Sequence, residues 1–290
     1  MKVDIDEHAG FCFGVVEAIR KAEEMLDAGK RLYCLGQMVH NEEELKRLEK
    51  KGLRYVSVDD FPRLTGETVL IRAHGEPPST YSLAEKYDIN MLEATCPIVL
   101  KLQERIRREH EQEKDEPMVI FGKANHPESI GLKGQANGRS IVVENEEELA
   151  SQIHKVNLNG AVSFYSQTTM DSDRFDRMEE LLKQEMKHPE LLKSHNTICG
   201  QMKRRKPALK KFASNQEVVV FVSGKKSSNG KFLYSVAKAQ NPRTYFVSSA
   251  KELKMEWFLD AEKVGVSGAT STPQWLLNEV AEKIRKEVES

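Results

Sequence analysis

The stretch Val3-Asp4-Ile5-Asp6-Glu7-His8-Ala9-Gly10-Phe11-Cys12-Phe13-Gly14-Val15 shows the pattern that decides the fold. An alternating, strand-like run ends in a turn, a cysteine follows, and a helical stretch begins behind it. The same context recurs at Ala94-Thr95-Cys96-Pro97 and at Thr197-Ile198-Cys199-Gly200. A helix N-terminus favours the thiolate, which is the form of cysteine that binds metal. The three repeats therefore indicate one shared metal centre held by Cys12, Cys96 and Cys199.

The spacing of these cysteines excludes a sequence-local metal motif. Intervals of 84 and 103 residues are far wider than those of a zinc ribbon or a ferredoxin-type cluster. A site where three α/β units meet, each supplying one ligand from the C-terminal edge of its sheet, fits these intervals. Cys34, inside Leu32-Tyr33-Cys34-Leu35 with no turn beside it, is interpreted as a core thiol.

Short β-branched runs alternate with helical patterns along the whole chain, which is typical of a mostly parallel α/β architecture. We find about twelve such runs, the ninth centred on His195–Ile198. Dividing the runs among the three cysteine contexts predicts three small α/β domains, each with a mostly parallel sheet of about four strands. We expect these domains to be arranged with pseudo-threefold symmetry around a central metal cluster. The predicted boundaries are 14–96, 97–193 and 194–290, and the N-terminal strand in 1–13 is expected to join the third domain.

The composition is that of a neutral globular protein. The chain has 290 residues with 44 basic and 45 acidic side chains, which does not favour a nucleic-acid or membrane surface. The N-terminus lacks the apolar segment of a signal peptide, and no apolar run approaches the ~18 residues of a membrane span. We therefore expect a cytoplasmic protein with reduced thiols. The basic run Lys203-Arg204-Arg205-Lys206 opens a helix without interleaved aromatic residues, so we interpret it as ordinary helix sequence.

Polar segments with catalytic potential follow the strand-like runs in the same way as the cysteines. A single histidine or a Ser-Ser-Asn before a helix is more often structural, but together these segments combine helix N-termini, hydroxyls, an amide and imidazoles. Such a set can hold a phosphate or diphosphate without a Walker loop, which the sequence lacks. Glu128 is the acidic residue of these segments and is a candidate proton carrier, with helix capping as the alternative. The candidate residues are His40, His74, His126, Glu128, Thr168, Ser227, Ser228, Asn229 and Ser271.

These residues fall into ordered motifs that resemble the IspH (LytB) family of 4-hydroxy-3-methylbut-2-enyl diphosphate reductases. The resemblance covers essentially the whole chain. The motifs are Gly10-Phe11-Cys12-x-Gly14-Val15, Val39-His40-Asn41, Arg72-Ala73-His74-Gly75, Ala94-Thr95-Cys96-Pro97, His126-Pro127-Glu128, Gln167-Thr168-Thr169, Thr197-Ile198-Cys199 and Ser227-Ser228-Asn229.

The resemblance implies three α/β domains around one [4Fe-4S] cluster, with three cysteine ligands and one open iron. It implies the last step of the non-mevalonate isoprenoid pathway, a two-electron reductive dehydroxylation that yields isopentenyl and dimethylallyl diphosphate. The histidines, Ser227, Ser228, Asn229 and Ser271 would bind the diphosphate, and Thr168 is also expected to contact the substrate. Glu128 with Thr168 would deliver the proton to the departing oxygen. An external donor such as ferredoxin or flavodoxin would supply the electrons.

Two alternatives and two departures from the family pattern accompany this interpretation. A non-catalytic iron–sulfur sensor would not need Glu128 and Thr168, and structural zinc on the three thiols would leave the histidine and serine segments unexplained. Where the family usually has an Ala-Thr pair and then Arg-Gln after the third cysteine, this chain has Gly200-Gln201-Met202-Lys203-Arg204-Arg205-Lys206. After Val15, Val16-Glu17 displaces the basic residue that is common near the start of the helix. Both departures spare every expected ligand and the expected acid.

Overall fold

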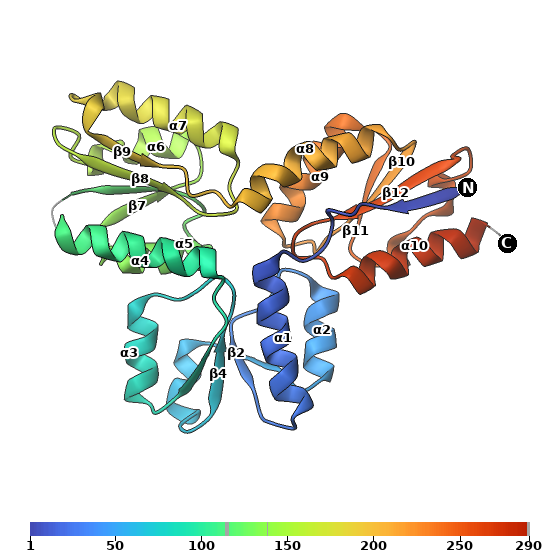
Figure 1. Cartoon of the computed structure of the whole chain (residues 1–290), viewed down its shortest axis with the longest axis horizontal. Helices are drawn as coiled ribbons and strands as arrows, with labels where there is room; N and C mark the ends of the chain where they lie inside the picture. Colours follow the sequence, from blue (N-terminus) through green and yellow to red (C-terminus); the bar gives the residue numbers. More distant parts are fainter. Residues whose placement is uncertain (114–115, 138, 289–290) are drawn as a thin grey trace. The chain divides into compact units, whose positions relative to one another are not determined.

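The structure, a computed structural model, describes residues 1–113, 116–137 and 139–288 (Figure 1). The chain divides into two compact units, Met1–Tyr55 with Arg204–Ser290 and Val56–Lys203. The described residues form twelve strands, with the following bounds: β1 Lys2–Ile5, β2 Tyr33–Leu35, β3 Arg54–Val56, β4 Thr68–Ile71, β5 Asn90–Glu93, β6 Met118–Phe121, β7 Ser140–Val143, β8 Val162–Ser166, β9 Leu192–His195, β10 Val218–Val222, β11 Thr244–Val247 and β12 Lys263–Gly268.

Ten α-helices in the described residues alternate with these strands. They are α1 Phe13–Asp27, α2 Glu42–Lys50, α3 Pro78–Lys86, α4 Pro97–Gln112, α5 Pro127–Gln135, α6 Glu146–Gln152, α7 Ser172–Glu185, α8 Gly200–Ser214, α9 Ser228–Gln240 and α10 Gln274–Val288. None of the helices in this part of the chain combines the length and the apolar composition needed to cross a bilayer.

The strands form three four-stranded sheets. One has the order β1-β12-β10-β11 and another the order β7-β6-β8-β9, with parallel pairing throughout both. The third contains β2 to β5, and its strands β4 and β5 are also parallel. The predicted α/β class with parallel sheets of four strands is confirmed. The predicted domain boundaries stay a prediction, and their residues 114–115, 138 and 289–290 lie outside the described residues.

The sheet of β1, β12, β10 and β11 is buried on both faces. Val218, Val220 and Val222 belong to one buried cluster with α10, whereas Val219 and Phe221 belong to another with α8 and α9. Burial on both faces explains why β10 is a continuous apolar run without polar alternation. Its carboxyl end is consequently the place where polar side chains can gather.

The sheet of β7, β6, β8 and β9 is enclosed in the same way. Val119 and Phe121 of β6 pack into the cluster with α7, and Met118 and Ile120 pack into the cluster with α4 and α5. Figure 1 shows α7 on one face of this sheet and α4 with α5 on the other. This packing directs the ends of β6 and β8 toward the loops that carry the candidate residues of this unit.

The ninth strand differs from its predicted position. We expected it at His195–Ile198, but β9 covers Leu192–His195 and its last paired residue, His195, lies opposite Tyr165. The Thr197 hydroxyl accepts a hydrogen bond from Ser166 N at 2.9 Å and donates one to Ser166 O at 2.6 Å. A side chain thus takes the place of the backbone ladder, which ends the strand three residues early.

Candidate functional site

Each of the three proposed cysteine ligands lies at the start of a helix. Cys12 is the N-cap residue of α1, Cys96 is the N-cap residue of α4, and Cys199 directly precedes α8. All three are partly exposed, whereas Cys34 in β2 is fully buried. The predicted helix N-terminal positions and the core position of Cys34 are confirmed. Their role as metal ligands remains a prediction.

The acidic candidate, Glu128, is joined to Cys199 through one residue. Thr168 N donates a hydrogen bond to Glu128 Oε1 at 2.6 Å, and Thr168 O accepts one from Cys199 N at 2.8 Å. The side chain of Glu128 is therefore committed to Thr168, and its own helix is capped instead by His126, whose Nδ1 accepts from Glu128 N at 3.2 Å. The side chain of Glu128 and the backbone of Cys199 therefore both hydrogen-bond to Thr168.

Burial determines the protonation of this carboxyl. Glu128 is 2% exposed, and desolvation raises its pKa to about 7 even though hydrogen bonds from the Thr168 backbone and side chain lower it. Near neutral pH the protonated and ionised forms are thus both populated, which suits a group that donates a proton and recovers it.

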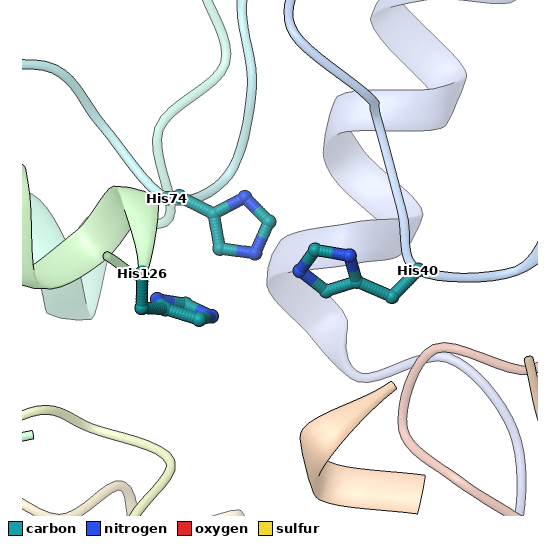
Figure 2. A group of neighbouring side chains, drawn as sticks. All are labelled: His40, His74 and His126. Atoms are coloured by element: carbon teal, nitrogen blue, oxygen red, sulfur yellow. The ribbon is translucent and has the colours of Figure 1, made fainter. Parts of the chain in front are cut away.

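In the unit Val56–Lys203, Cys96 is hydrogen-bonded to the loop that carries His74. Cys96 N donates to Ala73 O at 3.0 Å, which attaches the start of α4 to the residue before His74. The rings of His74 and His126 lie edge to face with their centroids 5.2 Å apart. Figure 2 labels both residues, and also His40 on the loop after β2. The structure therefore brings Cys96 next to the backbone of the residue before His74, and the ring of His74 next to that of His126.

In the other unit, Thr270 links the first cysteine to the proposed diphosphate-binding residues. Thr270 O accepts a hydrogen bond from Cys12 N at 3.3 Å, and Thr270 Oγ1 donates one to Asn229 Oδ1 at 3.2 Å. The next residue, Ser271, shares a hydrogen bond of 3.2 Å with Ser227 between their hydroxyl oxygens. Ser227 also caps α9 by accepting from Gly230 N, and Ser228 is the first residue of that helix.

A glycine allows His40 to join this group. A Cβ on Gly224 would lie 2.2 Å from His40 O and 2.9 Å from Asn41 Cα, so only a residue without a side chain permits this approach. Asn41 then caps α2 by accepting from Glu44 N at 3.1 Å. The unit thus brings together Cys12, His40, Ser227, Asn229 and Ser271 at the carboxyl ends of parallel strands.

The sequence analysis missed two residues that organise these groups. Thr270 carries the contacts of Cys12 and Asn229, and Gln167 accepts hydrogen bonds from Lys123 N and the Ser129 hydroxyl. Gln167 lies in the motif Gln167-Thr168-Thr169, and Thr270 directly precedes the candidate residue Ser271, so both stand next to residues that the sequence singled out. Only the hydrogen bonds distinguish their positioning role.

Comparison with known proteins matches the chain over nearly its full length. The LytB protein family matches residues 3–285. The 4-hydroxy-3-methylbut-2-enyl diphosphate reductase of Bacteroides fragilis is 43% identical over 290 residues, which cover 99% of each chain. The protein of the same name from Bacteroides thetaiotaomicron is 42% identical over 287 residues and 98% of each chain.

Two solved structures agree with these matches. A structure described as (E)-4-hydroxy-3-methyl-but-2-enyl diphosphate reductase, the terminal enzyme of the non-mevalonate pathway, is 34% identical with a TM-score of 0.73. It aligns with 99% of this chain and with 100% of its own. The E-1-hydroxy-2-methyl-but-2-enyl-4-diphosphate reductase of Plasmodium falciparum has a TM-score of 0.82 at 25% identity, covering 97% of this chain and 86% of its own.

Proposed function

Because the chain belongs to the LytB family, we propose that it catalyses the reductive dehydroxylation of 4-hydroxy-3-methylbut-2-enyl diphosphate. The products are isopentenyl and dimethylallyl diphosphate, in the last step of the non-mevalonate isoprenoid pathway. The observation that carries this proposal is the network in which Thr168 joins the buried Glu128 to Cys199. A sensor or a structural metal site does not need a titratable carboxyl within that network.

The three cysteines fit an iron–sulfur cluster. Cys12, Cys96 and Cys199 are soft thiol donors, partly exposed and located at helix N-termini, which favour the thiolate form. We assign them as the ligands of one [4Fe-4S] cluster that leaves one iron without a protein ligand. When bound, such a cluster would pass the electrons from the donor to the substrate and would provide a Lewis-acidic iron for its hydroxyl.

The diphosphate-binding role belongs to the polar residues at the ends of the strands. Ser227, Asn229 and Ser271 are held together by hydrogen bonds through Thr270 and at the N-terminus of α9, where backbone N–H groups and the helix dipole favour an anion. Ser228 and the three histidines, His40, His74 and His126, add hydroxyl and imidazole donors. Holding the diphosphate would orient the hydroxymethyl end of the substrate for reaction.

Glu128 supplies the proton. Hydroxide is a poor leaving group, so the departing oxygen must be protonated as its bond to carbon breaks, and water is released. A carboxyl with a pKa of about 7 holds this proton near neutral pH, and the Thr168 hydroxyl relays it. Overall, two electrons and two protons convert the allylic alcohol into the two alkene products and water, with one proton added to the departing oxygen and the other to an allylic carbon.

The electrons come from outside the chain. We propose a one-electron protein donor such as ferredoxin or flavodoxin, acting in the cytoplasm. An external reductant is required because the reaction consumes two electrons.

An anaerobic assay tests the function. The chain, purified without oxygen and reconstituted with iron and sulfide, should convert the allylic diphosphate into the two products with an excess of chemical reductant. Iron and sulfide analysis with a visible spectrum separates a cluster from zinc. A cluster-containing protein that binds substrate but never releases product would favour the sensor.

A further inference from the structure

One residue of the basic run Lys203-Arg204-Arg205-Lys206 is buried in an ion pair. Arg205, on α8, is 4% exposed, and its Nη1 lies 2.7 Å from Oδ2 of Asp6, which is 3% exposed. Arg205 Nη2 donates to Ser267 Oγ at 2.7 Å and to Gly268 O at 3.0 Å. Ser267 Oγ in turn donates to Asp6 Oδ2 at 2.8 Å, which closes a three-membered network.

This network joins the two segments that lead to the proposed site. Asp6 directly follows β1, and its Oδ1 accepts from His8 N at 3.0 Å at the start of the turn toward Cys12. Ser267 and Gly268 end β12, and the chain continues from there to Thr270 and Ser271. The two segments meet again where Cys12 N donates to Thr270 O.

We propose that Asp6 and Arg205 are a positioning pair that sets the separation between Cys12 and the group formed by Ser227, Asn229 and Ser271. On the proposed function, this separation is the distance between the reacting end and the diphosphate end of the substrate. The inference therefore rests on that function.

The geometry suits positioning better than stabilisation. Burying two charges is expensive, and an apolar pair of similar volume is often at least as stable. The planar guanidinium, however, binds several acceptors in a fixed arrangement that an ammonium group cannot reproduce. Here it holds a carboxylate, a hydroxyl and a carbonyl from the ends of two neighbouring parallel strands.

The proposal is tested with Arg205→Met, Asp6→Asn and Arg205→Lys. Arg205→Met should lower kcat by about 10²-fold, since a small misplacement of reacting groups can have an effect of this size. Iron and sulfide content should stay near that of the unaltered chain, and the dissociation constant of inorganic diphosphate should change by less than about threefold, because the Ser227–Ser271 contact is intact. Arg205→Lys should have a higher kcat than Arg205→Met, because lysine restores the positive charge but not the planar guanidinium with its several donors.

Hydrogen exchange on the protein without cluster provides a readout independent of activity. Peptides that contain Cys12 and Thr270 should exchange faster in Arg205→Met and Asp6→Asn, because their mutual hydrogen bond loses its support. A peptide from β6, in the other unit, should be unchanged.

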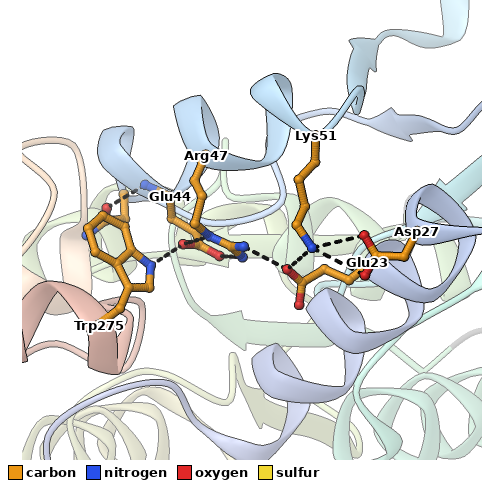
Figure 3. A network of polar contacts seen from close by, with 7 residues as sticks. Glu23, Asp27, Glu44, Arg47, Lys51 and Trp275 are labelled. Atoms are coloured by element: carbon orange, nitrogen blue, oxygen red, sulfur yellow. Dashed lines mark hydrogen bonds and ion pairs between the residues drawn. The ribbon is translucent and has the colours of Figure 1, made fainter.

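Arg47→Met is the matched control. Arg47 Nη2 pairs with the fully buried Glu44 at 2.6 Å, and Arg47 Nη1 pairs with Glu23 at 2.7 Å, in a network that also includes Trp275 (Figure 3). The variant breaks an ion pair with a buried carboxylate within α2, and a second ion pair between α2 and α1, in the same unit but away from the segments of Cys12 and Thr270. It should lower thermal stability without changing kcat or the exchange of the Cys12 and Thr270 peptides.

Two results would overturn the inference. One is unchanged exchange of both peptides in Arg205→Met and Asp6→Asn. The other is a normal kcat and a normal substrate-induced change in the paramagnetic resonance spectrum of the reduced cluster. If Arg205→Met fails to fold, the same measurements of kcat and hydrogen exchange on Asp6→Asn and Arg205→Lys test the inference. Failure of the unaltered chain to reduce the substrate would instead reject the proposed function, and the exchange experiment would still test the pair.

Discussion

At the scale of single residues, the chemistry depends on where one carboxyl is placed. Glu128 stands in the first turn of α5, where the helix N-terminus favours a negative charge, yet burial raises its pKa. Desolvation therefore outweighs the hydrogen bonds that Thr168 provides. The same side chain on an exposed helix would be fully ionised at neutral pH and could not act as an acid.

Glu128→Gln tests this role directly. The variant keeps the size and most of the hydrogen bonding but removes the acidic proton, so kcat should fall by about 10²–10⁴-fold with excess chemical reductant. Substrate should still bind and perturb the cluster spectrum. Thr168→Val should show a smaller decrease, because water can partly replace a relay. Turnover of Glu128→Gln near the normal rate would show that another group supplies the proton.

The pKa of Glu128 also predicts a dependence on pH. Since its pKa is raised to about 7, the proton is present below that value and lost above it, and kcat should decrease as the pH rises through about 7. The contribution of Glu128 to the free energy of unfolding is full below pH 4.5, decreases as the pH rises from 4.5 to about 7, and is lost above that value, because the folded state binds the proton more tightly than the unfolded state. The ratio of kcat for the unaltered chain to that for Glu128→Gln, measured across this range, isolates the effect. A constant ratio would contradict the assignment.

Asn229 allows a test of the diphosphate site. Asn229→Ala removes the acceptor of Thr270 and a donor for the diphosphate, so the dissociation constant of the substrate should rise roughly ten- to a hundredfold, the worth of a hydrogen bond to a charged group. The cluster spectrum should not change. Titration of the inactive Glu128→Gln protein, with and without the second substitution, measures this without turnover. Equal dissociation constants would place the diphosphate elsewhere.

At the scale of elements, the turn from strand to helix is the unit that builds the site. Cys12, Asn41, Cys96, His126 and Ser227 are N-cap residues of α1, α2, α4, α5 and α9. Each helix leaves unpaired N–H groups at its start, where anions and thiolates are stabilised. Parallel strands place such starts at one edge of each sheet, which is why ligands collect there.

Gly224→Ala tests one of these turns. The added Cβ would meet His40 O at 2.2 Å and force the His40 segment away, whereas Gly160 has no atom within 4 Å of the corresponding position. Gly224→Ala should weaken substrate binding by about tenfold through the displaced histidine and lower the unfolding free energy by about 1–3 kcal/mol. Gly160→Ala is the matched control and should change neither quantity. Calorimetry and thermal unfolding measure both effects, and identical results for the two variants would refute the argument.

At the scale of the whole molecule, the proposed cluster draws its ligands from distant parts of the chain. Cys12 belongs to one compact unit, and Cys96 and Cys199 belong to the other. Loading with iron and sulfide should therefore stabilise the folded chain as a whole, because a bound metal group adds its binding free energy to that of folding.

Serine substitutions separate the ligands from the core thiol. Cys12→Ser, Cys96→Ser and Cys199→Ser should each lose most of the iron and sulfide. Cys34→Ser should retain both, although a hydroxyl in a fully buried position lowers stability by about 1–3 kcal/mol. Iron and sulfide analysis of the four proteins, purified without oxygen, tests this prediction. If Cys34→Ser lost as much iron as the other three variants, the ligand assignment would be wrong.

The sequence alone predicted those features of the fold that depend on local sequence patterns. Buried parallel strands are continuous apolar runs, and turns are rich in glycine and polar residues, so the strands and the cysteines at helix starts could be read from the chain. The candidate residues at strand ends followed from the same alternation. The family motifs then indicated the activity that full-length relatives share.

Only the tertiary structure decided which groups are paired. Arg205 looked like its neighbours in a basic run, but its burial depends on Asp6, a partner 199 residues away. The early end of β9 depends on the Thr197 hydroxyl reaching Ser166, and the acidity of Glu128 depends on the packing that removes water from it. Desolvation and hydrogen bonding between distant segments arise only when the chain is folded, so local sequence patterns do not reveal them.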